Sequence, residues 1–183
     1  MRRLASLFAL GAILIPGVVG IREASVGAPV EFDTLASIDT LDPVERKVVG
    51  FFEERGITDR VALAVLLGNI RQESQFHSNI CEGGARVPYN QCKTGGYGLI
   101  QWTTKSRYNG LGTHALVTGG DPSSLDTQLS YLVTEGRWLA IEHKFQKPGQ
   151  SMDYYMDAAY YWLGWGVHGN RTTYSQQYLK QLS

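Results

Sequence analysis

The residue with the clearest chemical potential in this chain is Glu73, which ends an apolar helical pattern. Thr58 is a suitable N-cap, and residues 61–70 are almost all apolar, which predicts a helix over 58–73 that is buried on all sides. Glu73 shares one face of that helix with Asn69 through the four-residue spacing. We therefore expect protein, rather than bulk solvent, to surround this carboxylate.

A carboxylate in such a position can act as a general acid if it stays protonated near neutral pH. The helix macrodipole opposes its ionisation by only about 0.3–1 kcal/mol, which is less than one pKa unit. Burial in a pocket can raise a Glu pKa by several units, so burial would have to keep Glu73 protonated. The alternative is that Glu73 is an ordinary solvated residue at a helix end.

A glycine-rich turn further along the chain supplies polar and aromatic groups, in the order Gly95-Gly96-Tyr97-Gly98-Leu99-Ile100-Gln101-Trp102. Glycines allow positive φ angles and close backbone approach, which suits a chain that lines a polymer groove. Gln101 offers donors and an acceptor to sugar hydroxyl and acetamido groups. Tyr97 and Trp102 carry flat faces against which pyranose rings can pack, and the alternative for Trp102 is a place in the core.

Two blocks of the sequence together resemble the signature of the phage tail lysozyme family. They are Asn-Ile-Arg-Gln-Glu-Ser-Gln-Phe at 69–76 and Gly-Tyr-Gly-Leu-Ile-Gln-Trp at 96–102. That family belongs to the lysozyme-like group with goose-type lysozymes and soluble lytic transglycosylases, whose pattern is Glu-Ser, a spacer, then Gly-Leu-x-Gln. The resemblance spans residues 43–183. It implies a predominantly α-helical α+β fold of lysozyme type, with a cleft between helical lobes and a small β or loop element.

The resemblance also implies an enzyme that cleaves the β-1,4 link of peptidoglycan glycan strands, with Glu73 as general acid and with Ser74 and Gln101 at the substrate. Lytic transglycosylases carry a late-helix Ala-Tyr segment whose tyrosine approaches the catalytic Glu. The Ala-Tyr-Tyr run that ends at Tyr161 is similar, although the Asn-Ala-Gly that follows in that motif is absent. Tyr160 and Tyr161 are therefore candidate substrate-binding residues, and the alternative is that they fill a helical core.

Two reaction outcomes are compatible with one strong carboxylate. Attack by water gives a lysozyme, whereas attack by the substrate's own 6-hydroxyl gives the 1,6-anhydro product of a lytic transglycosylase. The candidate second carboxylate is Glu82, and inverting hydrolysis would need it about 6.5–9.5 Å from the acid. Its alternative is an exposed loop charge. The family resemblance favours hydrolysis, and the rival of another class is a non-catalytic glycan-binding or virion or envelope structural protein.

Cys81 and Cys92 enclose ten residues, and in an exported chain such a pair most simply forms a disulfide that braces a loop. The competing interpretations are a zinc site with His77, or a cysteine nucleophile with His77 or His114. Neither has convincing ligand spacing or a triad signature. We expect no metal and no organic cofactor, because acid catalysis on a glycoside needs none.

The first twenty residues have the pattern of a signal peptide. A basic start, Met1-Arg2-Arg3, precedes a sixteen-residue apolar run from Leu4 to Val19. A membrane anchor is the alternative, since this run is slightly short for a span. We expect a flexible leader over 21–41 and one catalytic domain over 42–183. The expected location is secreted, periplasmic or in the cell envelope, with a virion-associated protein as the alternative and membrane contact only through the signal peptide.

The charge balance argues against nucleic acid as a partner. Removing residues 1–20 takes away two arginines and no acidic residue, so 15 basic residues face 17 acidic ones and the net charge is −2. No run of Lys and Arg marks a phosphate-tracking surface. We expect a monomer that holds peptidoglycan strands by neutral hydrogen bonds and stacking.

The remaining helices follow from caps and apolar spacing. The first has Asp42 as N-cap, Pro43 at its first position and Glu45 to complete a capping box. Others are expected over 124–135, 138–145 and 151–164, with a closing helix that carries Tyr174 to Leu182. A helix after Thr103 or Thr104 is weakened by two glycines, and residues 77–96 are expected to form a loop with a short hairpin.

Overall fold

The computed structural model describes residue 35, residues 38–93 and residues 95–183, all of which fall within one compact unit. The expected signal peptide over 1–20 and most of the expected leader over 21–41 lie outside the described residues. The end of that leader is described, and Leu41 is only 2% exposed. Packing of the domain therefore begins before Asp42. No helix in the described ranges has both the length and the apolarity needed to cross a bilayer.

Helix α2 (Arg60–Ser74) is the central element of the fold. Every side chain from Ala62 to Ile70 is buried, which confirms the prediction of a helix buried on all sides. Asp59, not Thr58, is the N-cap, since its carboxylate accepts hydrogen bonds from the N–H groups of Val61 and Ala62. The helix ends at Ser74, and its C-cap Gln75 has a left-handed conformation.

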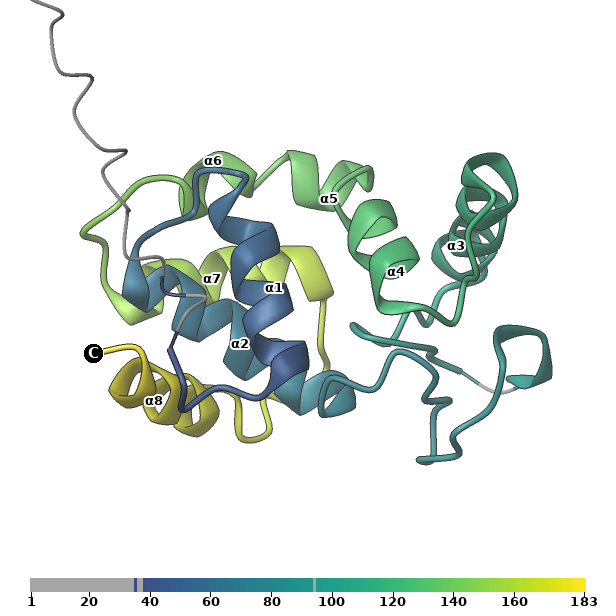
Figure 1. The fold of residues 1–183 in the computed structure, drawn as a ribbon, viewed down its shortest axis with the longest axis horizontal. Coiled ribbons are helices and arrows are strands. Elements are labelled where there is room, and N and C mark those ends of the chain that lie inside the picture. Colours follow the sequence, from purple (N-terminus) through teal and green to yellow (C-terminus); the bar gives the residue numbers. More distant parts are fainter. Residues whose placement is uncertain (1–34, 36–37, 94) are drawn as a thin grey trace, which may run out of the picture. The chain divides into compact units, whose positions relative to one another are not determined.

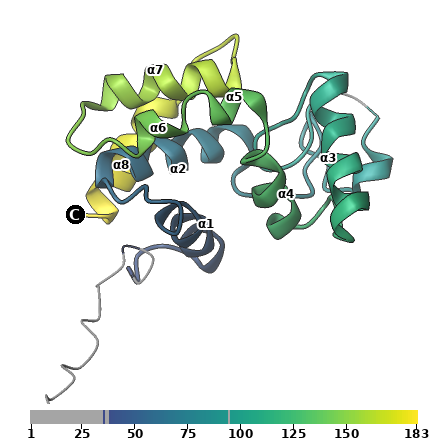
Figure 2. The ribbon, with the colours of Figure 1, turned by 90° about the horizontal axis from the view of Figure 1, so that it is seen from above.

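Three helices surround α2: α1 (Pro43–Glu53), α7 (Met152–Leu163) and α8 (Arg171–Gln181) (Figures 1 and 2). The capping box predicted at Asp42 is present in α1. Helix α7 begins after the N-cap Ser151 and ends at Gly164, close to the predicted bounds. These helices cover α2 and fix the direction in which its C-terminal end emerges.

The other helices are α3 (Lys105–Thr118), α4 (Leu125–Leu132), α5 (Gly136–Leu139) and α6 (Glu142–Phe145). The helix predicted over 138–145 is therefore two short helices. The helix expected after Thr103 or Thr104 is present as α3 despite its two glycines, which leave room for tyrosine side chains. A Cβ on Gly110 would lie 2.2 Å from the Tyr131 hydroxyl, and one on Gly112 would lie 2.7 Å from that of Tyr89. The predicted predominance of α-helix is confirmed.

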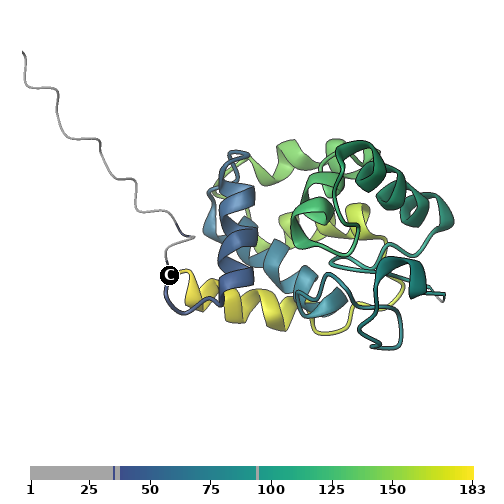
Figure 3. The same cartoon turned by 45° about the vertical axis from the view of Figure 1, so that its right-hand side comes forward.

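The segment between α2 and α3 is mostly irregular and lies beside α3 and α4 (Figure 3). Its β structure consists of two isolated antiparallel bridges, Ile80 with Arg86 and Cys81 with Tyr97. A short 3-10 helix, η2 (Tyr89–Gln91), precedes Cys92. The predicted disulfide between Cys81 and Cys92 is confirmed, with an S–S length of 2.05 Å. Because both sulfurs are used in this bond, the zinc and cysteine-nucleophile interpretations do not hold.

Buried polar contacts fasten this segment to the helices. The Ser74 hydroxyl at the end of α2 donates to the Leu99 carbonyl at 2.7 Å. Gln128 of α4 accepts from the Leu99 N–H at 2.8 Å and donates to the Ser78 carbonyl at 2.6 Å. Gly98 has a φ of +74°, and a Cβ there would lie 2.6 Å from the Gln128 amide. The turn over residues 97–102 is thus held at a fixed place relative to the end of α2.

The close approach of α2 and α8 depends on Gly68, where a Cβ would lie 2.5 Å from the Ser175 backbone nitrogen and 2.8 Å from its Cα. We predict that Gly68→Ala lowers the free energy of unfolding by about 1–3 kcal/mol, because α8 must move away. The matched control is Gly136→Ala in α5, where nothing lies within 4 Å of the added Cβ and stability should hold or rise slightly. Urea unfolding measures both, and a Gly68→Ala protein as stable as wild type would contradict the prediction.

Candidate active site

A cleft of about 640 Å³ lies at the C-terminal end of α2. Glu73 contributes from α2, and Ile100 and Gln101 contribute from the glycine-rich turn. The other lining residues include Trp165, from the α7–α8 connection, and Arg171, the first residue of α8. Of the described residues that line the cleft, only Glu73 is acidic. The cleft therefore gathers one carboxyl group with polar, aromatic and cationic neighbours.

The Glu73 side chain is only 14% exposed. Burial raises the pKa of this carboxyl above its ordinary value, because the charged form loses solvation. The charge and hydrogen bond of Arg171, and then the charge of Arg107, oppose that effect. Burial outweighs them, so the pKa of Glu73 stays raised. Compared with a free glutamic acid in water, this balance favours the protonated form.

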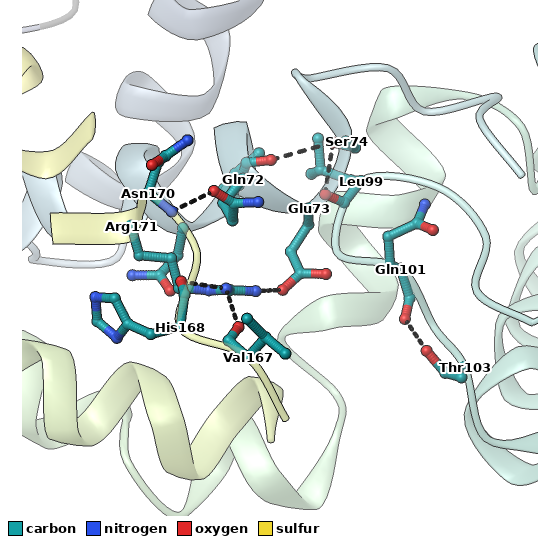
Figure 4. Close-up of polar contacts among 12 residues, drawn as sticks. Gln72, Glu73, Ser74, Leu99, Gln101, Thr103, Val167, His168, Asn170 and Arg171 are labelled. Carbon is teal, nitrogen blue, oxygen red and sulfur yellow. Dashed lines mark hydrogen bonds and ion pairs between the residues drawn. The ribbon is translucent and has the colours of Figure 1, made fainter. Parts of the chain in front are cut away.

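Arg171 holds the Glu73 carboxylate in place (Figure 4). Its guanidinium donates to Glu73, to the Val167 carbonyl at 3.0 Å and to the His168 carbonyl at 2.7 Å. The same group lies 4.4 Å from the centre of the Trp165 ring, in a cation–π contact. With this many partners Arg171 has little freedom, so it restricts the position of the carboxylate that it binds.

A second contact ties the same two helix ends together. The Asn170 N–H donates to the Gln72 side-chain oxygen at 2.7 Å (Figure 4). Gly169 has a φ of +61°, and a Cβ there would lie 2.8 Å from the Gln72 amide carbon. The connection before α8 is therefore shaped to fit against the residue that precedes Glu73.

Gln101 also lines the cleft, as its predicted role at the substrate requires. Its φ is +51°, a left-handed conformation that is unfavourable for a residue with a side chain. The side-chain amide donates to the Gly98 carbonyl at 3.0 Å, and the Thr103 hydroxyl donates to the Gln101 carbonyl at 2.8 Å (Figure 4). Such strain, kept in place by surrounding bonds, is found most often at functional sites.

Three of the predicted substrate-binding residues are structural. Ser74 is buried, and its hydroxyl bonds the Leu99 carbonyl. Tyr97 is fully buried, and its hydroxyl donates to the Val87 carbonyl at 3.0 Å. Trp102 is fully buried too, which favours the alternative that it belongs to the core. None of these side chains can meet a sugar ring, because packing covers them; their role is to shape the turn that presents Gln101.

Three further candidates lie outside the cleft lining. Glu82 is exposed, which agrees with the alternative that it is an ordinary loop charge. Its carboxylate accepts a hydrogen bond from the Gly96 N–H at 3.2 Å. Tyr160 and Tyr161 are more than half exposed on α7. Tyr160 packs edge-on against Trp165, with ring centres 5.1 Å apart, so it touches a cleft residue but does not itself line the cleft. Neither tyrosine of this pair is among the described residues that line the cleft with Glu73.

The sequence interpretation missed three arginines and one tryptophan of the cleft, namely Arg107, Arg137, Arg171 and Trp165. They come from α3, α5, α8 and the α7–α8 connection, far apart in sequence. No local run of basic residues in the sequence indicates that these three arginines share a site. Only the fold brings them together, and it changes the expectation that neutral groups alone would meet the substrate.

A buried ion pair supports the wall that carries Arg107. Arg107 donates to Glu135 through Nε at 2.6 Å and Nη2 at 2.8 Å, in a two-bond arrangement. The Trp102 indole N–H donates to the same carboxylate at 3.0 Å. Glu135 is 8% exposed, so its charge depends on these donors for compensation.

We predict that Glu135→Gln destabilises the protein by about 3 kcal/mol, because it leaves a mostly buried guanidinium without its anion. The control is Asp126→Asn, which removes the exposed pair of Asp126 with Lys47 and should cost about 1 kcal/mol or less. Thermal or urea unfolding of the two variants provides the comparison. Equal losses of unfolding free energy in the two variants would contradict the prediction that the buried pair contributes more than the exposed one.

Comparison with known proteins gives one family. A family model described as phage tail lysozyme matches residues 43–182, which includes every element that lines the cleft. No curated protein and no solved structure gives a significant match. The family match agrees with the resemblance carried by the two sequence blocks, and it confirms the expected lysozyme-like fold class.

Proposed function

Because this chain belongs to the phage tail lysozyme family, we propose that it cleaves the glycan strands of peptidoglycan with Glu73 as the general acid. Family membership supports a peptidoglycan-cleaving, lysozyme-like activity in general. The observation that carries the finer proposal is the Glu73 carboxyl itself, which lies in the cleft with a pKa raised by burial. The fixed partner Arg171 adds to this support, since it holds that carboxyl in one orientation.

In the first step, neutral Glu73 gives its proton to the oxygen of the glycosidic link. The bond from that oxygen to the sugar C1 breaks, and an oxocarbenium-like centre develops at C1. The carboxylate that forms is paired with Arg171, which already donates to it. Such pre-organised compensation means that charge can appear on Glu73 without a large rearrangement.

For a lysozyme-type hydrolase, water then completes the reaction. Its oxygen bonds to C1, and the proton that it loses restores neutral Glu73, directly or through solvent. The products carry a normal reducing end. The family favours this outcome, which we take as the primary proposal.

A second candidate is lytic transglycosylation, favoured by the presence of a single acidic residue among the described residues of the cleft. Here the substrate's own 6-hydroxyl attacks C1 and closes a 1,6-anhydro ring, while its proton passes to Glu73. One protein carboxylate is enough for this sequence of acid and base steps. Glu82 does not support a two-carboxylate mechanism, because it lies outside the cleft lining.

The disulfide fits an extracellular or virion-associated protein, because such bonds persist in oxidising surroundings. We propose export through the segment over 1–20 as the route, with assembly into a virion as the alternative. A non-catalytic glycan-binding or structural protein is the remaining rival, and it differs from the enzyme in releasing no fragments.

We predict that Glu73→Gln lowers the rate of peptidoglycan cleavage by about 10²–10⁴-fold, the usual contribution of a general acid. Mass spectrometry of the soluble fragments measures the loss and identifies the end group, reducing for hydrolysis or 1,6-anhydro for transglycosylation. The matched control is Glu82→Gln, which makes the same chemical change on an exposed loop and should retain wild-type activity.

Circular dichroism should accompany the assay, because Glu73→Gln alters the contact between Glu73 and Arg171 that joins the ends of α2 and α8. A folded Glu73→Gln protein with wild-type activity would contradict the proposed acid. Wild-type protein that binds peptidoglycan but releases no fragment would favour the non-catalytic rival.

A further inference from the structure

Arg137 is the cleft arginine whose charge has no partner among the described residues. Of the other two, Arg107 is paired with Glu135, and Arg171 donates to Glu73 and to two backbone carbonyls. Arg137 is exposed at the start of α5 and lines the cleft with them. It therefore presents a positive charge to whatever occupies the cleft.

Gly164 accommodates the guanidinium of Arg137. This glycine has a φ of +70° and forms the C-cap of α7, where the helix dipole favours a cation. A Cβ on Gly164 would lie 2.7 Å from Arg137 Nη1, so a side chain at this position would crowd that nitrogen. The guanidinium thus lies against bare backbone at the end of α7, while its remaining N–H groups are available to a ligand.

A second hollow adjoins the cleft at Arg137. It has a volume of about 360 Å³ and shares Ser106, Arg107 and Arg137 with the cleft. Its other lining includes Tyr131 and Glu135, and the Glu135 carboxylate is already taken by Arg107 and Trp102. Arg137 thus lies at the junction of a main groove and a side hollow, and it is the available cation at that junction.

We propose that Arg137 binds an oxyanion on a branch of the glycan strand, with the branch in the side hollow. This inference rests on the proposed function, since it takes the glycan strand to occupy the cleft. A guanidinium matches carboxylate and phosphate oxygens through two parallel N–H donors. An unbranched neutral glycan offers no such group, so the cleft distinguishes strands with anionic branches from neutral polymers.

Two branches of bacterial wall glycan carry this chemistry, the carboxylates of a stem peptide and the phosphates of an attached wall polymer. The test uses three purified substrates: strands with stems only, strands with phosphate polymer only, and strands stripped of both, in which the lactyl carboxylates exposed by stem removal are converted to amides. Cleavage rates are measured for wild type, Arg137→Gln and Arg137→Lys. The matched control is Arg60→Gln, which removes an exposed arginine at the opposite end of α2.

The expected result is a roughly tenfold higher kcat/KM on an anionic strand than on the stripped strand, mostly through KM. Arg137→Gln should lose this preference, Arg137→Lys should recover part of it, and Arg60→Gln should keep it. Added salt should weaken the preference in wild type, because screening reduces an exposed charge contact. The substrate on which Arg137→Gln loses rate identifies the anion as carboxylate or phosphate.

Calorimetric binding of a disaccharide–peptide, beside the same disaccharide with a lactyl amide in place of the peptide, measures the preference without cleavage. If wild type cleaves nothing yet binds the peptide form more tightly through Arg137, the proposed function fails and the anion site stands. Equal cleavage and equal binding of anionic and stripped forms by wild type would overturn the site while leaving the enzyme. An Arg137→Gln protein that keeps the wild-type preference would overturn it too.

Discussion

The contact between Glu73 and Arg171 is the interaction on which the rest of the site depends. It joins the last turn of α2 to the first residue of α8 and places both groups in a largely buried position. Burial raises the pKa of Glu73 and Arg171 lowers it, so the pKa reflects the competition between the two. A weaker pair or a wetter cleft would shift that competition. The proposed chemistry requires both forms of Glu73, because the acid must first lose a proton and then regain it.

Most of the fold serves to keep these two helix ends at one distance. Gly68 permits close packing of α2 on α8, and Ser74 fastens the turn with Gln101 to the end of α2. Gln128 secures the same turn from α4 through its bonds to Leu99 and Ser78. Buried hydrogen bonds from several elements thus support the site. They keep the Glu73 carboxyl group in a fixed orientation at the edge of the open cleft.

The elements with strong local signals could be predicted from the sequence, and the side chains that meet in space could not. The buried helix α2, the capping box at Asp42 and the disulfide between Cys81 and Cys92 all follow from spacing and caps. Ser74, Tyr97 and Trp102 belong to the signature blocks, yet their side chains support the backbone instead of facing the cleft. A sequence motif does not distinguish a side chain that supports the backbone from one that faces the cleft, because each role restricts which residue type can occupy the position. The cleft arginines come from three separate helices, so only the packing of those helices could identify them.

The most direct test of Glu73 as a buried acid is an NMR titration of its side-chain carboxyl in wild type and in Arg171→Met. In wild type the pKa should lie above the ordinary value of 4.5, because burial outweighs the two arginines. In the variant it should rise further, since the largest opposing charge is gone. Activity that needs the protonated form would then be lost as pH rises through that pKa, at a higher pH in the variant. A wild-type pKa at or below 4.5, or one that Arg171→Met leaves unchanged, would contradict a desolvated acid balanced by Arg171.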